Sequence, residues 1–215
     1  MSATDVVLVD YGVGNLLSVR RALEHCGASV LVTSDQKKVS AARKVVLPGV
    51  GAFGNAMEAL WRLGLVDALH EVAQRQVPFL GICLGMQLLL DESEEFGITK
   101  GLGLIPGRVV GIPTKTVDGQ SQKIPHIGWS ELYPSDASGQ WHEAILEGTA
   151  SVDAAYFVHS FMSVTDDMAD QNAHCLFGGH RIPAVISSGP IVGCQFHPEK
   201  SGDVGLRILR QFISR

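Results

Sequence analysis

The chain has 215 residues and a formal net charge of −5; hydrophobic residues make up 46% of it and charged residues 18%. This length suits a single domain with a substantial core, and the composition excludes a disordered protein. We find no Lys/Arg cluster typical of a nucleic-acid or membrane surface, no apolar run of transmembrane length and no signal-peptide pattern. The four cysteines are widely spaced without a CxxC pair. We therefore expect a reducing, cytoplasmic location rather than a disulfide scaffold.

The first 90 residues alternate between predicted strands and helices. Short apolar runs predict strands at 6–9, 29–32, 44–47 and 77–82, and apolar residues at helical spacing predict helices at 15–25 and 55–74. Because these strands are apolar on both faces, they are typical of a parallel sheet that helices cover on both sides.

The pattern changes after residue 104. Strands are predicted at 108–112, 154–158, 182–186 and 191–196, separated by Gly/Pro turns, and a last helix at 204–212. The polar stretch 133–148 is expected to be a surface loop or a short helix. No linker divides the chain, so we expect residues 1–215 to form one α/β domain. Its central mixed sheet would be mostly parallel, flanked by helices, and would carry an antiparallel extension.

Cys83 stands in Gly81-Ile82-Cys83-Leu84-Gly85-Met86-Gln87, between a predicted strand and a predicted helix. Glycines two residues before and two after a reactive side chain are typical of the strained G-x-nucleophile-x-G turn, here with Cys in place of Ser. Such a turn lifts the sulfur above the sheet and sets it at a helix start, whose dipole favours a thiolate. We predict that Cys83 attacks carbonyl carbons. The competing interpretation is a small buried core cysteine.

His197 is the candidate base for this nucleophile, and Glu199 follows two residues later. In an extended segment, residues i and i+2 point the same way. Glu199 would then accept a hydrogen bond from one imidazole nitrogen of His197 and leave the other facing Cys83. The three side chains would form a triad of nucleophile, base and orienting carboxylate.

A glycine-rich segment, 48–54, follows one predicted strand and precedes a helix. Its backbone N–H groups are candidate donors for an oxyanion, and the amide of Leu84 is the natural second donor. The segment also matches GxGxxG, so a dinucleotide-binding turn is the competing interpretation. That interpretation requires an acidic residue at the end of the next strand, where Cys83 stands instead.

The remaining histidines and cysteines give weaker signals. His174, Cys175 and His180 could suggest a metal, but their spacing fits no strong zinc pattern, so we expect no metal site. Cys26 and Cys194 are expected to be core residues. Four histidines are expected to be ordinary core or surface residues: His126, His142, His174 and His180.

Segments spread in order over nearly the whole chain carry a family resemblance. The Cys83 turn and His197-Pro198-Glu199 resemble the class I glutamine amidotransferases. Segments 10–16, 47–53, 101–107, 125–129, 156–160 and 197–201 resemble the glutaminase subunits of imidazole glycerol phosphate synthase, from histidine biosynthesis. Two departures lie outside the predicted triad: Ser130 stands where the family commonly has Asn, and Phe161-Met162 where it has aromatic pairs.

The resemblance implies a class I glutamine amidotransferase domain over residues 1–215 that uses no cofactor. Cys83 would attack the side-chain carbonyl of L-glutamine, His197 would protonate the departing ammonia, and Glu199 would hold His197. Water activated by His197 would then hydrolyse the thioester. The resemblance also implies the following substrate-binding and oxyanion positions: Val50, Gly51, Leu84, Gln87, His159, Ser160 and Phe161.

The resemblance further implies a heterodimer with a cyclase subunit, which receives the ammonia through an internal channel. We expect Asn15 and Lys200, which flank motifs at the catalytic end, to contact this partner. We also expect the segment 48–51 to move during activation.

Two alternative functions stay open at this point. The chain could feed another ammonia acceptor, such as a sugar, or it could be a non-catalytic regulatory module that keeps the fold.

Overall fold

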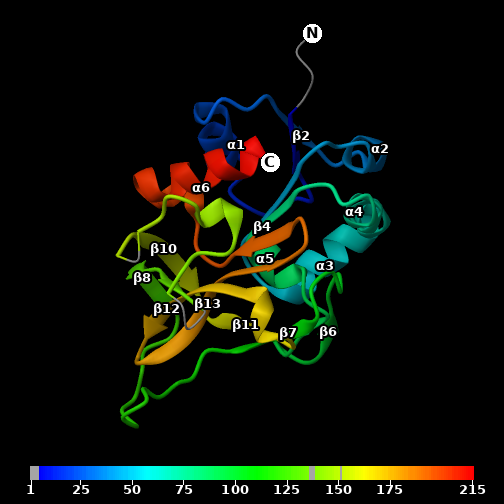
Figure 1. Ribbon diagram of the computed structural model, residues 1–215. Helices are drawn as coiled ribbons and strands as arrows, with labels where there is room; N and C mark the ends of the chain where they lie inside the picture. The colour runs from blue at the N-terminus through cyan, green and yellow to red at the C-terminus, as the bar shows by residue number, and fades with distance from the viewer. Residues whose placement is uncertain (1–4, 136–138, 151) are drawn as a thin grey trace.

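The computed structural model describes residues 5–135, 139–150 and 152–215 (Figure 1). An eight-stranded sheet forms its centre, in the order β2-β1-β3-β4-β14-β13-β12-β9. The first five strands of this order pair in parallel and the last three are antiparallel. The strands of this sheet are β1 (Val6–Val9), β2 (Val30–Thr33), β3 (Val45–Gly49), β4 (Phe79–Cys83), β9 (Tyr133–Pro134), β12 (Gln171–Phe177), β13 (His180–Ser188) and β14 (Ile191–Cys194).

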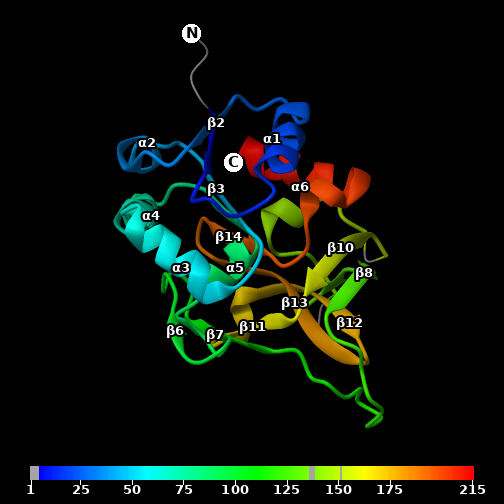
Figure 2. The same ribbon diagram turned by 180° about the vertical axis from the view of Figure 1, so that it is seen from behind.

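Helices cover both faces of the sheet, as the apolar strands predict. Successive residues of β1 face opposite ways, so Val6 and Leu8 pack with α1 and α6, whereas Val7 and Val9 pack with α2 to α5. Figures 1 and 2 show α1 and α6 together on one side and α2, α3 and α4 on the other. The helices are α1 (Leu16–His25), α2 (Gln36–Ser40), α3 (Phe53–Arg62), α4 (Leu65–Gln74), α5 (Leu84–Leu88) and α6 (Gly202–Ser214).

Two smaller sheets form the antiparallel extension. One pairs β8 with β10, and the other has the order β11-β7-β5-β6. Their strands are β5 (Glu92–Ser93), β6 (Thr99–Lys100), β7 (Gly107–Gly111), β8 (His126–Glu131), β10 (Ala154–His159) and β11 (Phe161–Thr165). Three 3₁₀ turns complete the fold: η1 (Ala144–Leu146), η2 (Met168–Asp170) and η3 (Pro198–Lys200). The predicted α/β class with a mostly parallel mixed sheet and an antiparallel extension is confirmed.

Two sequence-based expectations need correction. The single helix expected over 55–74 is two helices, because Gly64 adopts a left-handed conformation (φ 64°) between α3 and α4 and breaks the helical hydrogen bonding. The polar stretch 133–148 contains the short strand β9 and the turn η1; its residues 136–138 lie outside the described residues.

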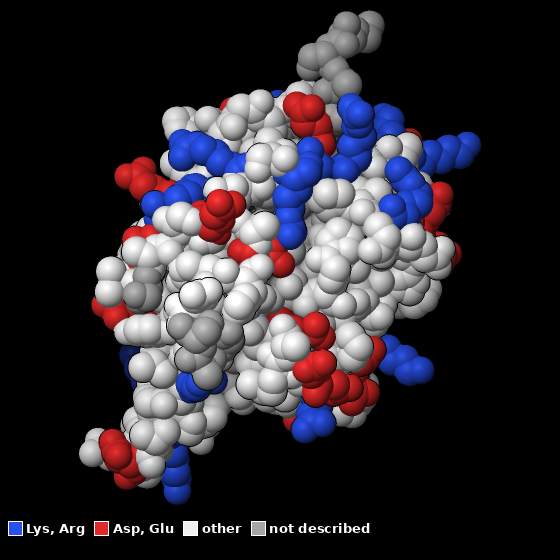
Figure 3. Space-filling model, viewed as in Figure 1, with Lys and Arg blue, Asp and Glu red and all other residues white. Residues whose placement is uncertain are grey.

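Charged side chains are spread over the surface. Figure 3 shows most of the Lys and Arg side chains of one face along its upper part, with some Asp and Glu among them, a broad uncharged area below, and a mainly acidic group lower down. None of the helices in the described parts of the chain is long and apolar enough to cross a membrane.

The junction of β3, β4 and α5 is packed without spare room. A Cβ atom at Gly85 would lie 1.8 Å from the carbonyl oxygen of Leu47, and one at Gly81 would lie 2.6 Å from the carbonyl oxygen of Gly85. These contacts involve backbone atoms, which cannot rotate away. Glycine at both positions is therefore a condition for α5 to start directly above the end of β4.

We predict that Gly85→Ala lowers the free energy of unfolding by on the order of 3 kcal/mol, because its methyl group would force β3 and α5 apart. Urea denaturation followed by circular dichroism would measure the loss. Gly111→Ala is the matched control, because nothing lies within 4 Å of a Cβ atom there. Equal stability of the two variants would contradict the packing described for this junction.

Candidate active site

Cys83 is the last residue of β4 and directly precedes α5. Its backbone has φ 55° and ψ −110°, a conformation that non-glycine residues rarely adopt and that stores strain. The parallel pairing of β3 and β4 sets Gly49 beside Cys83 at the carboxyl ends of both strands. The predicted elbow is therefore present, and the side chain is 6% exposed.

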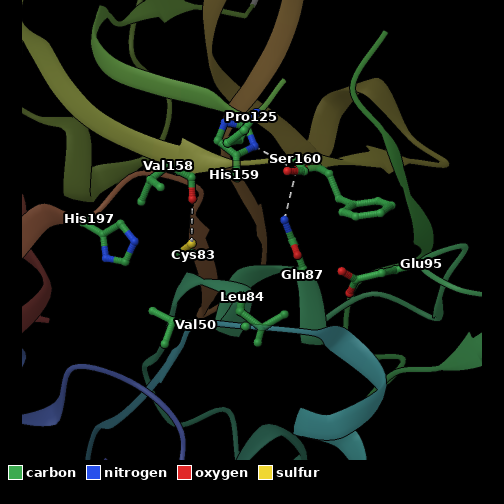
Figure 4. A pocket seen from close by; sticks show the side chains of 12 residues that line it. Val50, Cys83, Leu84, Gln87, Glu95, Pro125, Val158, His159, Ser160 and His197 are labelled. Carbon is green, nitrogen blue, oxygen red and sulfur yellow. Dashed lines mark hydrogen bonds between the residues drawn. The ribbon is translucent and has the colours of Figure 1, made fainter. Parts of the chain in front are cut away.

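A cavity of about 320 Å³ opens beside the sulfur (Figure 4). It brings together segments that are far apart in the sequence: the end of β3, the elbow, the β5–β6 hairpin, the junction of β10 and β11, and the segment after β14. Nine of the twelve sequence-predicted positions line it; Glu199 and the two interface residues do not. The lining residues are Val50, Gly51, Cys83, Leu84, Gln87, Glu95, Pro125, Val158, His159, Ser160, Phe161 and His197.

His197 and Glu199 form a buried pair behind the cavity. His197 Nδ1 lies 2.8 Å from Glu199 Oε1, and their side chains are 4% and 1% exposed. The contact was predicted, but its local geometry was not. The strand ends at Cys194 and Glu199 lies within the 3₁₀ turn η3, so a tight turn rather than an extended segment brings the carboxylate back to the imidazole.

The backbone of His197 is held by two hydrogen bonds. Its N–H donates to the carbonyl of Tyr156 at 3.0 Å, and its carbonyl accepts from the hydroxyl of Ser201 at 2.7 Å. Ser201 in turn accepts from the N–H of Tyr156 at 2.9 Å. Strand β10 and Ser201 therefore hold the backbone of His197, and Glu199 in the turn η3 holds its imidazole ring.

The electrostatics of this pair favour a protonated His197. Burial lowers the pKa of His197, but its interactions with Cys83 and Glu199 outweigh burial and raise that pKa to about 9. Its Nε2 atom is buried and has no hydrogen-bond partner within the described structure. Figure 4 shows the ring beside the Cys83 sulfur. An imidazolium with one nitrogen on a carboxylate and the other free toward the sulfur can stabilise a thiolate and then deliver a proton.

The segment 48–51 borders the same cavity. The hydroxyl of Tyr11 donates to the carbonyl of Pro48 at 2.8 Å and fixes the start of the segment. Gly51 has φ 95°, and Val50 is 42% exposed. Leu84, which carries the second predicted oxyanion donor, is the first residue of α5, and Figure 4 shows it on the same side of the sulfur as Val50.

Gln87 is held in one orientation. Its Nε2 donates to the carbonyl of Phe161 and to Gln195 Oε1, both at 3.0 Å. Both amide hydrogens are therefore used within the protein, so Gln87 can contact a ligand only through its acceptor oxygen. Gln195 Nε2 lies 3.8 Å from Cys83 Sγ and extends this chain of contacts to the nucleophile.

Glu95 is a cavity residue that the sequence reasoning missed. Its Oε2 accepts from the backbone N–H of Phe53 at 2.6 Å, at the start of α3. The only signal in the sequence was the acidic run 91–95, which gives no indication that one member turns inward. The carboxylate adds negative charge to a cavity that already contains the acceptor oxygen of Gln87 (Figure 4).

The two predicted interface residues lie outside the cavity, and both are exposed. The Asn15 side chain accepts from the N–H of Ser18 and caps α1. Lys200 Nζ lies 6.0 Å from the centre of the Tyr156 ring, which contacts the exposed ring of Trp129 edge-on.

Two competing chemistries find little support in the geometry. The Glu95 carboxylate already occupies the start of α3, where a dinucleotide phosphate would have to bind. Within the described residues, no group of three or more His, Cys, Asp or Glu side chains could hold a metal ion. His174 packs against Tyr133, and His180 Nε2 lies 2.8 Å from the carbonyl of Lys115.

Comparison with known proteins places this chain in a family. Residues 7–215 match the family "Glutamine amidotransferase class-I". The chain is also 48% identical over 210 residues to "Imidazole glycerol phosphate synthase subunit HisH 1" from Legionella pneumophila (strain Lens), covering 98% of this chain and 99% of that protein. The chain belongs to the class I glutamine amidotransferases. Within them, it groups with the HisH proteins.

A second HisH relative, from Geobacillus sp. (strain WCH70), is 45% identical over 96% of this chain and 95% of its own length. Solved amidotransferase structures share the fold at lower identity. The structure of PurLQS from Thermotoga maritima matches with a TM-score of 0.70 at 19% identity, over 97% of both chains. The glutaminase domain of CTPS from Trypanosoma brucei matches with a TM-score of 0.64 at 14% identity, over 98% of this chain and 94% of that one.

We predict that Glu199→Gln lowers the pKa of His197 and weakens the fold in a pH-dependent way. The folded-state pKa of about 9 lies above the unfolded value of 6.5, so charged His197 stabilises the fold fully below pH 6.5 and loses this effect as the pH rises through 9. The difference in unfolding free energy between wild type and variant should therefore be largest near pH 5.5 and vanish by about pH 9.5. Urea denaturation across this range would measure it, and a difference that grows with pH would refute the assignment.

Proposed function

We propose that this chain is the glutaminase subunit of an imidazole glycerol phosphate synthase, and that residues 1–215 form its single catalytic domain. The observation that carries the proposal is the strained Cys83 elbow, which shares one cavity with His197 while Glu199 holds that imidazole. The similarity to HisH proteins over nearly the whole chain supports the choice of glutamine as substrate.

The reaction follows from the positions of the three side chains. The Cys83 thiolate attacks the side-chain carbonyl carbon of glutamine and forms a C–S bond. His197, charged and fixed by Glu199, gives its proton to the amide nitrogen as the C–N bond breaks and ammonia leaves. A water molecule then gives a proton to His197 and attacks the thioester. Glutamate leaves, and the thiolate and imidazolium are restored.

The tetrahedral intermediate carries a negative oxygen that needs two donors. The N–H of Leu84, directly after the nucleophile, provides one. The segment 48–51 provides the other, through the amide of Val50 or Gly51. Tyr11 fixes the Pro48 end of this segment and Gly51 permits a change of peptide orientation, so the donor can form in response to a partner.

The cavity is suited to the charged amino-acid end of the glutamine substrate. The Gln87 oxygen and the Glu95 carboxylate are acceptors, and we assign them to the α-ammonium group of glutamine. The backbone of His159, Ser160 and Phe161 borders the same cavity and holds the rest of the amino-acid end. The Glu95 carboxylate in this cavity favours the binding of a cationic substrate group.

The ammonia is delivered to a cyclase subunit in a heterodimer. Free ammonia protonates in bulk water and loses its nucleophilicity, so a channel to the partner preserves it. We assign docking to the surface around Lys200, the Tyr156 and Trp129 rings, and Asn15. Exposed aromatic residues beside a cation are typical of the anchors of protein interfaces.

The described residues include four free cysteines, and free thiols are typical of proteins in the reducing cytoplasm. We assign the chain to that compartment.

Neither alternative function gains support. An amidotransferase subunit that feeds another acceptor is not favoured, because the relatives covering both chains almost completely are HisH proteins. A non-catalytic module has no need for a strained nucleophile or for an imidazolium whose free nitrogen faces it.

Cys83→Ala should abolish glutamine-dependent synthesis by the complex and leave ammonia-dependent synthesis unchanged, because only the first requires the thioester. Coupled turnover with cyclase, measured with glutamine or with an ammonium salt, separates the two activities. Cys26→Ala is the control, since that thiol contacts the Leu206 carbonyl far from the cavity. Loss of both activities in Cys83→Ala would contradict the division of labour.

Lys200→Glu should weaken cyclase binding by about fivefold, equivalent to roughly 1 kcal/mol for a partly exposed charged contact. Titration calorimetry or surface plasmon resonance would measure the dissociation constant. Lys38→Glu on α2 reverses an exposed charge that lies away from the catalytic end and serves as the matched control. Unchanged affinity and unchanged coupling in Lys200→Glu would exclude this residue from the interface.

A further inference from the structure

The side chains of two buried histidines next to the cavity have no role in the reaction described above. His126, at the start of β8, is 2% exposed, and His159, at the end of β10, is 6% exposed. They pair across the β8–β10 ribbon, with His126 Nδ1 3.1 Å from His159 Nε2. The His126 ring is stacked between Phe157 and Phe177, at centroid distances of 5.0 and 4.3 Å. This stacking fixes the plane in which its nitrogens can bond.

The contacts of the two rings determine where every hydrogen lies. His159 Nδ1 is 2.8 Å from the carbonyl oxygen of Phe161, which can only accept, so Nδ1 carries the hydrogen. Burial lowers the pKa of each histidine to about 4, so both rings are neutral near pH 7 and carry one hydrogen each. His159 Nε2 must then accept, and His126 Nδ1 must donate to it.

The series of hydrogen bonds extends from the two rings toward the molecular surface. Because His126 Nδ1 carries the hydrogen, His126 Nε2 is an acceptor, and the hydroxyl of Ser130 donates to it at 2.9 Å. Ser130 is half-buried and stands next to the exposed Trp129. In the other direction, the Phe161 carbonyl accepts a second hydrogen bond, from Gln87. A one-way series of hydrogen bonds thus runs from Ser130 through both rings to the glutamine cavity.

We propose that Ser130, His126 and His159 form a neutral hydrogen-bonded relay that fixes the Phe161 carbonyl and the Gln87 amide, and that Ser130 is thereby a positioning residue for glutamine. The relay deepens the proposed glutaminase function and rests on it for the identity of the ligand. The Phe161 carbonyl at its end accepts from Gln87 Nε2, which leaves the Gln87 oxygen as an acceptor in the cavity that Glu95 also lines. Hydrogen bonds in such a series polarise one another, so removing the first donor affects the last acceptor.

Loss of the Ser130 hydroxyl leaves His126 Nε2 as a buried acceptor without its donor. The Phe161 carbonyl still requires the hydrogen of His159 on Nδ1, so both rings keep their tautomers. The unpaired nitrogen favours a shift of the His126 ring toward another donor, and this shift moves the His159 ring that is bonded to it. The Phe161 carbonyl then moves as well, and the Gln87 amide loses one of the two partners that orient it.

The kinetic test compares Ser130→Ala, Ser130→Thr and Ser188→Ala in the complex with cyclase. Ser130→Ala should raise the KM for glutamine by about fivefold, the effect of one hydrogen bond, with kcat within about twofold, because binding rather than chemistry is affected. Ser130→Thr keeps a hydroxyl donor and should restore the KM. Ser188 lies on β13 at the end of the sheet opposite Cys83, so Ser188→Ala should leave the KM unchanged.

The spectroscopic test uses ¹⁵N chemical shifts of the imidazole rings in the full-length chain, with signals assigned by comparison with His126→Phe. Both relay histidines should show the Nδ1–H tautomer in wild type and in Ser130→Ala, and the Nε2 signal of His126 should shift in Ser130→Ala because that nitrogen loses its hydrogen-bond donor. An Nε2–H tautomer for either ring in wild type would overturn the relay, as would a wild-type KM in Ser130→Ala. If the wild-type complex hydrolyses no glutamine, the proposed function fails, and the tautomers still decide whether the relay exists.

Discussion

The backbone conformation of Cys83 is the constraint on which the rest of the site depends. A left-handed φ at a non-glycine residue costs on the order of 1–3 kcal/mol and persists only where the surroundings enforce it. Here the enforcement comes from close backbone contacts, since Gly81 and Gly85 allow β4, β3 and α5 to meet with no space for a side chain. The strain places the sulfur at the carboxyl edge of a parallel sheet, where segments from both halves of the chain can converge.

Burial lowers the pKa of all three histidines near the cavity, but only His197 has partners that outweigh this effect. His126 and His159 face aromatic rings and neutral acceptors, so burial lowers the pKa of each and keeps them neutral. His197 is also buried, but Cys83 and Glu199 raise its pKa to about 9. One small region therefore contains a charged imidazole that can transfer a proton and two neutral imidazoles that can only orient their neighbours.

The extent to which sequence predicts this structure depends on the range of the interactions. The parallel strands, the elbow and the order of elements follow from local patterns of apolar residues and glycines, and the structure has them. The break at Gly64 was missed because a lone glycine inside an apolar helical pattern has no local signature of its left-handed conformation. Glu95 was missed because its orientation depends on a contact with the backbone of Phe53, 42 residues earlier in the sequence, which no local pattern indicates.

His126 is another residue whose contacts could not be predicted from the sequence. Its sequence neighbours carry no hydrogen-bonding signal, and an ordinary core or surface histidine was the expected outcome. Its relation to the cavity arises only when β8 pairs with β10 and sets it opposite His159. The pairing register, rather than any motif, determines that the two rings meet.

Strand β10 explains how a surface contact can influence the cavity. Tyr156 packs against Trp129 at the surface and bonds both to the backbone N–H of His197 and to Ser201, while His159, three residues later, borders the cavity. The strand is bonded to β8 along its whole length, so it behaves as one rigid unit. A contact that shifts the exposed Trp129 ring and the half-buried Tyr156 ring would therefore act on the backbone of His197 and on the backbone that borders the cavity together. Under the docking proposed above, coupling to hydrolysis would require only a small displacement of this ribbon.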